Sequence, residues 1–396
     1  MSGIRSSLSS ILFKRVGLRS ALLTPRKESS TCLSDPREIS QDEPQENGID
    51  HKLKSPRRKV CQPVLDHFDA QYTAELGSLW TSVRSVLLNP GCWQYGVMMN
   101  RFADVQELRT RLLELGYCSL LPQRHTTPPY VPPSHSPHGG SLECYVQRGP
   151  VRLPAPRHEP GYLKRYFLLN AASLLPVLAL GVAENERVLD MCSAPGGKAV
   201  AILQTTCPGF LHCNEVDRHR CDWLSKTLES YVPADVMKTL RVTNQDGRDF
   251  GQTHQAAYDK VLVDAPCSND RSWLFSPSEL RGHQWLKERQ KLPALQTQLL
   301  RSALAAVRPG GAVVYSTCTL SQAENHQVVE GVLATCPWVE SEDLQEELLL
   351  ANALSEHFVF APPPPAPLWP PGLLVVPERI GHTWGPMYLC RLRRTR

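Results

Sequence analysis

The sequence lacks the features that would assign it to a membrane, disulfide-rich or metal-binding class. No apolar run reaches the roughly 18 residues that span a bilayer. The longest candidate, Phe167 to Val182, is interrupted by Asn170, Ser173 and Pro176. No two of the 13 cysteines are spaced Cys-x-x-Cys, and an odd number of scattered cysteines is typical neither of a disulfide framework nor of a zinc site. We therefore expect a globular protein with reduced thiols, no metal ion and no membrane partner.

Acidic residues are absent from the first 27 positions, where serine and apolar residues alternate with basic ones. The basic residues are Arg5, Lys14, Arg15, Arg19, Arg26 and Lys27. This composition is typical of a mitochondrial transit peptide, whereas a secretory signal would have an uninterrupted apolar core. We predict a transit peptide over residues 1–35, with a disordered basic tail as the alternative, and a location in the mitochondrial matrix. Residues 36–60 are polar and predict a disordered linker.

Apolar residues recur every three or four positions from Val64 to Leu87, which predicts an amphipathic helix interrupted near Gly77. The same spacing from Val105 to Leu115 predicts another helix, which Gly116 would end. We expect a small helical module over residues 61–120. Residues 121–160 are rich in Pro, His and Gly and predict an irregular connector.

From about residue 161 onwards, short apolar segments alternate with helical ones. The predicted strands are Arg187–Met191, Phe210–Glu215, Leu240–Thr243, Lys260–Val263 and Ala312–Ser316, and the predicted helices are Lys198–Gln204, His219–Tyr231 and Leu292–Val307. This alternation predicts an α/β domain over residues 161–396, with a Rossmann-like doubly wound, mostly parallel sheet. Leu373–Val376 and Met387–Leu392 would add an antiparallel hairpin at its edge. Ligands should bind at the carboxyl ends of the strands.

A glycine-rich turn follows the first predicted strand and opens a helix, whose backbone N–H groups can meet an anionic group. The turn consists of Cys192, Ser193, Ala194, Pro195, Gly196, Gly197 and Lys198. It matches neither a P-loop nor a dinucleotide fingerprint, which favours a nucleotide-like ligand without a long phosphate chain. Glu215, at the next strand end, can accept ribose hydroxyls or be a solvent-exposed strand end. Asp246 and Gly247 follow the third strand and can reach an adenine.

Two cysteines and a carboxylate follow the fourth and fifth predicted strands. The fourth strand leads into Asp264-Ala265-Pro266-Cys267 and the fifth into Ser316-Thr317-Cys318-Thr319-Leu320. Most cysteines of such a fold are small buried hydrophobes. Strand ends beside a ligand pocket are where functional residues lie, so we expect Asp264, Cys267 and Cys318 to converge there.

Together, these motifs resemble those of the Sun-type RNA cytosine-5 methyltransferases, over about residues 160–396. The resemblance implies S-adenosylmethionine as cofactor, Cys318 as the covalent nucleophile and Cys267 as the residue that assists product release. DNA cytosine methyltransferases use the Pro-Cys cysteine instead, so this assignment follows from the resemblance and not from spacing. The resemblance further implies cofactor contacts from Cys192 through Lys198 and from Glu215, Arg220, Asp246 and Asp264. Ser193 departs from the family, in which alanine is usual.

The chemistry of cytosine explains why such a site contains cysteines. A thiolate can add to carbon 6, and a proton on ring nitrogen 3 then gives an enamine whose carbon 5 attacks the methyl group. A protonated carboxyl group, here Asp264, can serve the ring nitrogen. After transfer a base removes the carbon 5 proton and the thiolate leaves, which gives a second cysteine a role.

Three further stretches resemble the mitochondrial members of this family that methylate methionine tRNA. They are residues 92–95 (CWQY), 166–173 (YFLLNAAS) and 268–275 (SNDRSWLF). The resemblance implies the wobble cytosine of mitochondrial methionine tRNA as target, and no stable protein partner. Two alternatives are a mitochondrial ribosomal RNA methyltransferase and a non-catalytic RNA-binding assembly factor with the same fold. A small-molecule methyltransferase would not need two cysteines at strand ends.

The sequence contains no recognisable separate RNA-binding domain. We therefore predict that the N-terminal helices and basic side chains around the catalytic segment contact the RNA. The candidates are Arg84, Arg101, Arg109, Arg111, Lys164, Arg165 and Arg271.

Overall fold

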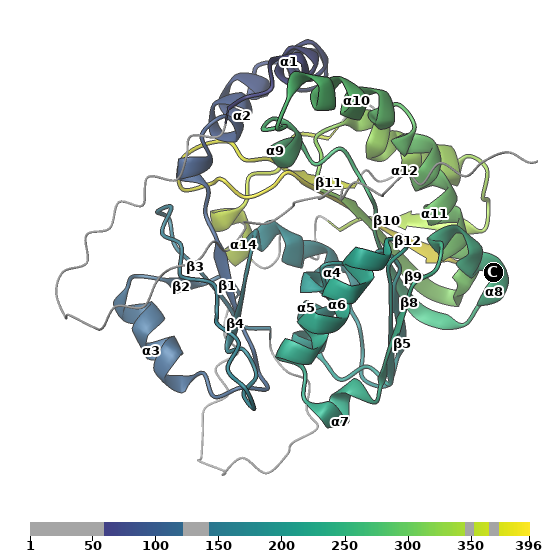
Figure 1. Ribbon diagram of the computed structural model, residues 1–396. Coiled ribbons are helices and arrows are strands. Elements are labelled where there is room, and N and C mark those ends of the chain that lie inside the picture. Colours follow the sequence, from purple (N-terminus) through teal and green to yellow (C-terminus); the bar gives the residue numbers. More distant parts are fainter. Residues whose placement is uncertain (1–58, 122–141, 345–351, 364–371) are drawn as a thin grey trace, which may run out of the picture. The chain divides into compact units, whose positions relative to one another are not determined.

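The computed structural model describes residues 59–121, 142–344, 352–363 and 372–396 (Figure 1). The predicted transit peptide (1–35) and nearly all of the predicted linker (36–60) lie outside the described residues, as does the middle of the predicted connector (121–160). Within the described part, no helix is both long and apolar enough to cross a membrane.

The larger sheet is built mainly from parallel strands. These are β5 (Arg187–Asp190), β6 (Phe210–Asn214), β7 (Leu240–Thr243), β8 (Tyr258–Asp264) and β9 (Val307–Thr317). The antiparallel strands are β10 (Val339–Glu342), β11 (Leu373–Val375) and β12 (Met387–Arg394). The order is β10-β12-β9-β8-β5-β6-β7, with β11 paired to β12. Because β5 lies between β6 and β8, the direction of winding reverses beside β5.

The hairpin near the end of the chain differs from the prediction in one respect. Strands β11 and β12 pair as expected, but β12 also lies between β9 and β10 and is therefore an inner strand. Strand β10 forms that edge of the sheet. Only Val339 of its four residues is buried, so the strand leaves no alternating pattern in the sequence.

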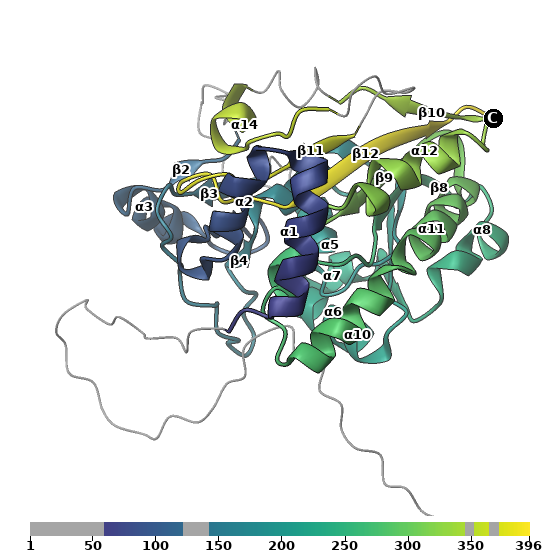
Figure 2. The ribbon, with the colours of Figure 1, turned by 90° about the horizontal axis from the view of Figure 1, so that it is seen from above.

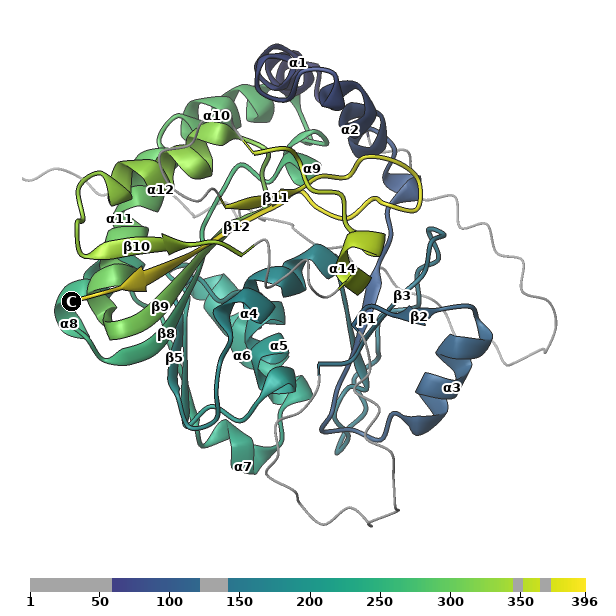
Figure 3. The ribbon, with the colours of Figure 1, turned by 180° about the vertical axis from the view of Figure 1, so that it is seen from behind.

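Successive residues of the central strands pack against different layers of helices (Figure 3). Val188 and Leu262 belong to the core on one face, whereas their neighbours Leu189 and Val261 belong to the core on the other. One layer contains α4 (Leu175–Leu180), α5 (Gly197–Thr205) and α6 (Arg218–Tyr231), and the other contains α8 (Phe250–Thr253), α11 (Leu292–Ala306) and α12 (His326–Leu333). Side chains of a strand point alternately to its two faces, so helices cover both faces. The prediction of a doubly wound fold is confirmed.

A smaller antiparallel sheet contains β1 (Gly96–Met99), β2 (Cys118–Ser119), β3 (Cys144–Val146) and β4 (Tyr166–Leu169), in the order β2-β3-β1-β4. Helix α3 (Gln106–Glu114) packs on it through Leu112. The sheet crosses the predicted boundaries near residues 120 and 160, because β3 and β4 come from segments assigned to the connector and the catalytic domain. The segment 61–120 is therefore not only helical. Strands this short leave no periodic signal.

Helices α1 (Gln62–Leu76) and α2 (Leu79–Leu87) are separated at Gly77, as the sequence predicts. The φ of 57° at this position favours glycine. Phe68 and Tyr72 of α1 share a core cluster with Leu274 and Leu320, which follow Cys267 and Cys318 along the chain. Figure 2 shows α1 beside α10 (Glu279–Arg289), with which it is in contact.

The packing of α1 on α10 predicts the effect of a change at Gly282. A Cβ atom there would lie 2.4 Å from the Cys61 sulfur and 3.2 Å from Val64 Cγ2, so Gly282→Ala forces the helices apart. We expect the free energy of unfolding to fall by about 1–3 kcal/mol, the usual cost of overpacking. Urea denaturation of the full chain measures this loss.

Gly331→Ala in α12 is the matched control. A Cβ atom at this helical position would meet nothing within 4 Å, so alanine should stabilise the protein by about 0.5–1 kcal/mol. Equal effects of the two substitutions would contradict the close contact between α1 and α10.

Candidate active site

The parallel strands of the larger sheet end at a common edge. There β5 ends in Asp190, β6 in Asn214 and β8 in Asp264. The segments that follow these strands hold the residues that the sequence predicts to bind a ligand. In a doubly wound sheet this edge, beside the strand where the winding reverses, is the usual place for a ligand.

The turn between β5 and α5 requires glycine at two positions. The backbone of Gly196 has φ 106°, and a Cβ atom there would lie 3.1 Å from Leu224 Cδ1. A Cβ atom at Gly197 would lie 3.1 Å from Phe167 Cε1. Only glycine therefore lets the turn pack this closely while its backbone faces the strand ends.

Asp190 is a buried carboxyl group that the sequence analysis did not select as a site residue. Ser193 Oγ donates a hydrogen bond to Asp190 Oδ2 over 2.7 Å, whereas Oδ1 has no hydrogen-bond partner among the described residues. Burial raises the pKa of Asp190 to about 7. The hydroxyl of Ser193, which departs from the usual alanine, thus supplies a partner for a buried acid. An acidic residue directly before the turn was the signal available in the sequence.

Glu215 is almost fully buried at the end of β6, and Arg220 connects it to the turn. Arg220 Nη1 lies 3.2 Å from Glu215 Oε2, and Arg220 Nη2 donates to the carbonyl of Ala194 over 2.8 Å. Glu215 Oε1 accepts from the backbone N–H of Asp217 over 3.0 Å. Glu215 Oε2 has an ion pair but no hydrogen bond within the described residues. This oxygen is therefore an acceptor that a ligand can use.

Asp246 and Gly247 lie after β7, where Asp246 is the N-cap of the short helix η3 (Gly247–Asp249). Arg248 Nη2 pairs with Asp246 Oδ2 over 2.5 Å, and this hydrogen bond lowers the pKa of the carboxyl group. A Cβ atom at Gly247 would lie 2.7 Å from Leu299 Cδ2 and 3.0 Å from Met191 Cγ. Glycine therefore allows η3 to lie against the end of β5.

Asp264 accepts hydrogen bonds on both carboxyl oxygens. Lys198 Nζ donates to Oδ2 over 2.7 Å and Ser316 Oγ donates to Oδ1 over 2.9 Å. The lysine comes from the glycine-rich turn and the serine from β9. Asp264 thus connects the turn with the two strands that carry the cysteine motifs.

The two predicted cysteines lie in contact. Cys267 Sγ is 3.2 Å from Cys318 Sγ, and the backbone N–H of Cys318 lies 3.3 Å from Cys267 Sγ. The hydrogen bond to Cys318, together with burial, raises the pKa of Cys267 well above its usual value. Either thiol can donate in this contact between the two sulfurs. Both side chains are partly exposed, and the described cysteines, these two included, form no disulfide.

Several residues that the sequence predicts to contact RNA bind other groups of the protein. Arg84 pairs with Asp69 and Arg109 with Glu143, each over 2.6 Å. The other engaged residues are Arg101, which donates to the carbonyl of Thr206, and Arg271, which donates to the carbonyl of Thr383 and lies over the ring of Trp93. Arg111 and Arg165 are exposed. Among the described residues, no cluster of His, Cys, Asp and Glu could hold a metal ion.

Comparison with known proteins identifies the family of this chain. Residues 177–366 match the family described as 16S rRNA methyltransferase RsmB/F. The mitochondrial tRNA (cytosine(34)-C(5))-methyltransferase of Danio rerio is 57% identical over 86% of this chain and 90% of its own length. The chain belongs to the RsmB/F family of RNA methyltransferases. The predictions of a Sun-type family member and of an RNA cytosine-5 methyltransferase are thus confirmed.

Two further proteins are similar to this chain. The 5-cytosine rRNA methyltransferase NSUN4 of Mus musculus is 38% identical over 86% of this chain and 90% of its own length. A methyltransferase homolog protein from Pyrococcus horikoshii has a similar fold, with a TM-score of 0.56 and 22% identity over 86% of this chain and 99% of its own.

The contact between the two sulfurs predicts how the alkylation rate of Cys267 changes when Cys318 is replaced. Cys318→Ala removes the main cause of its raised pKa, so alkylation of Cys267 by iodoacetamide at pH 8 should accelerate about 3- to 10-fold. Mass spectrometry of the native protein measures this rate. The exposed Cys118 serves as internal control and should react equally in both proteins. An unchanged rate at Cys267 would refute the proposed hydrogen bond.

Proposed function

We propose that the protein transfers a methyl group from S-adenosylmethionine to carbon 5 of the wobble cytosine of mitochondrial methionine tRNA, through a covalent bond from Cys318 to carbon 6. The observation that carries this proposal is the 3.2 Å contact between the sulfurs of Cys318 and Cys267, near the Asp264–Lys198 pair. A non-catalytic RNA-binding factor has no need for a thiol pair at strand ends.

The relatives support a tRNA target over a ribosomal one. The relative named for cytosine 34 of tRNA is 57% identical, whereas NSUN4 of Mus musculus, named for rRNA, is 38% identical. Cytosine 34 is the wobble position of an anticodon, and the three stretches described above favour methionine tRNA. The word mitochondrial in the relative's name supports a matrix location, with residues 1–35 as transit peptide. Ribosomal RNA is the second candidate target.

The residues around the turn fit S-adenosylmethionine. Asp190 Oδ1 and Glu215 Oε2 are buried acceptors without a hydrogen-bond partner among the described residues, and the cofactor carries hydroxyl and ammonium donors. Glu215, oriented by Arg220, would hold the ribose hydroxyls. Residues 192–198 would approach the cofactor through their backbone, and Asp246 and Gly247 would border the adenine. When bound, the cofactor supplies an electrophilic methyl group.

The cysteine pair can carry out both addition and elimination. Cys318 would add to carbon 6 as a thiolate, with the sulfur of Cys267 beside it at 3.2 Å. Once Cys318 is bonded to the ring, the main cause of the raised pKa of Cys267 is gone. This thiol can then release its proton to solvent and, as a thiolate, take the proton from carbon 5. Loss of that proton restores the ring double bond and expels Cys318.

Asp264 would serve ring nitrogen 3 during these steps. A proton passes from the carboxyl group to the nitrogen as Cys318 adds, and it returns after elimination. Lys198 Nζ donates to the carboxyl group over 2.7 Å and would hold it in place for this role.

The RNA contacts would come mainly from residues before the catalytic segment. Lys164 and Arg165 line a cavity of about 880 Å³ together with the ring of Tyr162, which is 75% exposed. Asp104 and Glu159 line the same cavity, so its charge is mixed. Basic side chains and an exposed aromatic ring are groups that bind the backbone and bases of RNA.

Substitution of each cysteine tests the covalent mechanism. Cys318→Ala should reduce methyl transfer by about 10³-fold or more and abolish the covalent RNA adduct, because the nucleophile is lost. Cys267→Ala should accumulate an adduct that survives denaturing electrophoresis, because addition proceeds while elimination stalls. Both variants should bind S-adenosylmethionine normally in calorimetry. An adduct trapped by Cys318→Ala and absent from Cys267→Ala would exchange the two roles.

The shape of the RNA should decide whether it is a substrate. A thiolate cannot reach carbon 6 of a stacked and paired base, and an unpaired loop base costs least to extrude. We expect methylation of an isolated anticodon stem-loop of methionine tRNA, and none when the same cytosine is locked in a duplex. Equal rates on both RNAs would contradict extrusion from a loop. Activity on ribosomal RNA alone would favour the second candidate.

A further inference from the structure

A buried carboxylate holds the loop that carries Cys267. Glu324, in helix η4 (Gln322–Glu324), is 1% exposed. Its Oε2 accepts from the backbone N–H of Ser268 over 3.0 Å and its Oε1 accepts from Ser268 Oγ over 2.7 Å. Gln296 Nε2 donates to the carbonyl of Pro266 over 2.9 Å and to Glu324 Oε2 over 3.1 Å. The residues on both sides of Cys267 are therefore fixed.

A second buried carboxylate holds the loop that carries Cys318. Asp270 Oδ2 accepts from the backbone N–H of Leu320 over 2.7 Å, and its Oδ1 accepts from Thr319 Oγ1 over 3.1 Å. The hydroxyls of Ser268 and Thr319 lie 2.9 Å apart, where the two loops meet. Since Ser268 follows Cys267 and Thr319 follows Cys318, this contact helps to set the distance between the sulfurs.

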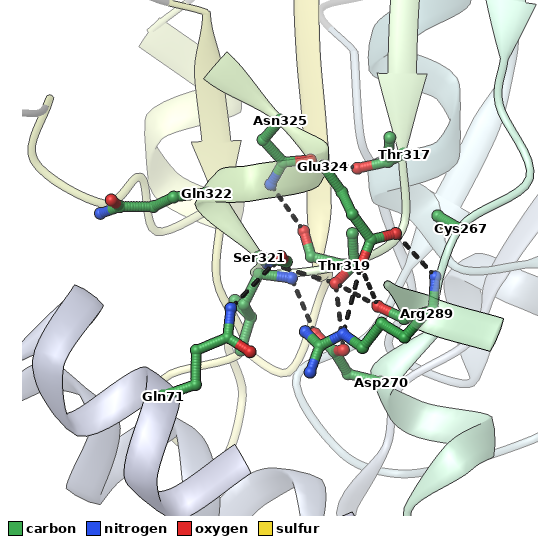
Figure 4. A network of polar contacts seen from close by, with 12 residues as sticks. Gln71, Cys267, Asp270, Arg289, Thr317, Thr319, Ser321, Gln322, Glu324 and Asn325 are labelled. Carbon is green, nitrogen blue, oxygen red and sulfur yellow. Dashed lines mark hydrogen bonds and ion pairs between the residues drawn. The ribbon is translucent and has the colours of Figure 1, made fainter. Parts of the chain in front are cut away.

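Arg289 contacts Glu324 directly and is connected to Asp270 through the hydroxyl of Tyr72, which belongs to α1. Arg289 Nε lies 3.3 Å from Glu324 Oε1, as Figure 4 shows, and Arg289 Nη2 donates to Tyr72 Oη over 2.6 Å. Tyr72 Oη in turn donates to Asp270 Oδ1 over 2.8 Å. The hydroxyl of Tyr72, on α1, is therefore the bridge between the cation and the carboxylate behind Cys318.

Helix α1 makes two further contacts with the chain after Cys318. Glu75 Oε2 accepts from the backbone N–H of Gln322 over 2.9 Å, and Gln71 Nε2 donates to Ser321 Oγ over 3.3 Å. Figure 4 shows Gln71 directed from the helix toward Ser321. Contacts from successive turns of one helix thus hold the segment that begins at Thr319.

We propose that Tyr72 is a positioning residue for the cysteine pair, and that α1 completes the back of the active site by holding the loops of Cys267 and Cys318 in register. This inference rests on the proposed function, because it assigns the pair to catalysis. Tyr72 acts through Asp270 and Arg289, and its hydroxyl also lies 3.4 Å from Thr319 Oγ1. A thiol displaced by about 1 Å from its target can lower the rate of a reaction about 100-fold. The hydroxyl should therefore affect the rate of reaction and not the binding of RNA or cofactor.

Tyr72→Phe tests this role, because it keeps the buried ring and removes only the hydroxyl. We expect kcat for methylation of the stem-loop to fall about 10- to 100-fold, with KM for RNA and the affinity for S-adenosylmethionine unchanged. The single-turnover rate of adduct formation should fall by the same factor. The alkylation rate of Cys267 should also change, because the sulfurs are no longer held together.

Tyr145→Phe is the matched control. Tyr145 is also buried, and its hydroxyl donates over 2.7 Å to Glu143, which pairs with Arg109. This substitution removes the same kind of bond in the smaller sheet, so kcat should not change. Equal kcat for Tyr72→Phe and the wild type would overturn the proposal, as would equal losses in the two variants.

Glu75→Ala is a second test of the role of α1 if Tyr72→Phe does not fold. It removes the acceptor for Gln322 from the partly exposed side of α1, and kcat should fall a few-fold with KM unchanged. An unchanged kcat would then overturn the role of α1. If wild-type protein neither methylates the stem-loop nor forms an adduct, it is the proposed function that fails.

Discussion

Strands β8 and β9 pair in parallel, with Asp264 beside Ser316 at their carboxyl ends. Cys267 and Cys318 follow these two residues closely along the chain, so both loops leave the sheet at the same level. The sulfurs meet at 3.2 Å because the pairing has this register. A slip by one residue would turn every side chain of one strand to the opposite face and would separate the two motifs.

The acids at the carboxyl ends of the strands have different surroundings. Asp264 has donors on both oxygens, from Lys198 and Ser316. Asp190 keeps one buried oxygen without a hydrogen bond among the described residues, and Oε2 of Glu215 has only its ion pair with Arg220. A buried polar atom without a partner costs about 1–3 kcal/mol. This cost arises beside the glycine-rich turn, where a ligand with hydrogen-bond donors would remove it.

The N-terminal helices belong to the same core as the loops of the site. Phe68 and Tyr72 pack with Leu274 and Leu320, and Arg289 lies 4.8 Å from the centre of the Phe68 ring. Burial of two carboxylates near one guanidinium requires a well-defined arrangement of donors, and the hydroxyl of Tyr72 is one of them. A segment that the sequence alone describes as a separate helical module is therefore integrated into the catalytic unit.

The sequence by itself determined the doubly wound sheet, the glycine-rich turn and the positions of Cys267 and Cys318 after two strand ends. Each of these features is recorded in consecutive residues, through strand periodicity, through glycine at Gly196 and through motifs that follow strands. The tertiary structure alone decided the contact between the sulfurs, the second sheet and the partners of Tyr72. Tyr72 and Asp270 are 198 positions apart, and β1 pairs with one strand from within the predicted connector and one from beyond it. Such pairings depend on which surfaces pack together, and this information is not contained in any local stretch of the chain.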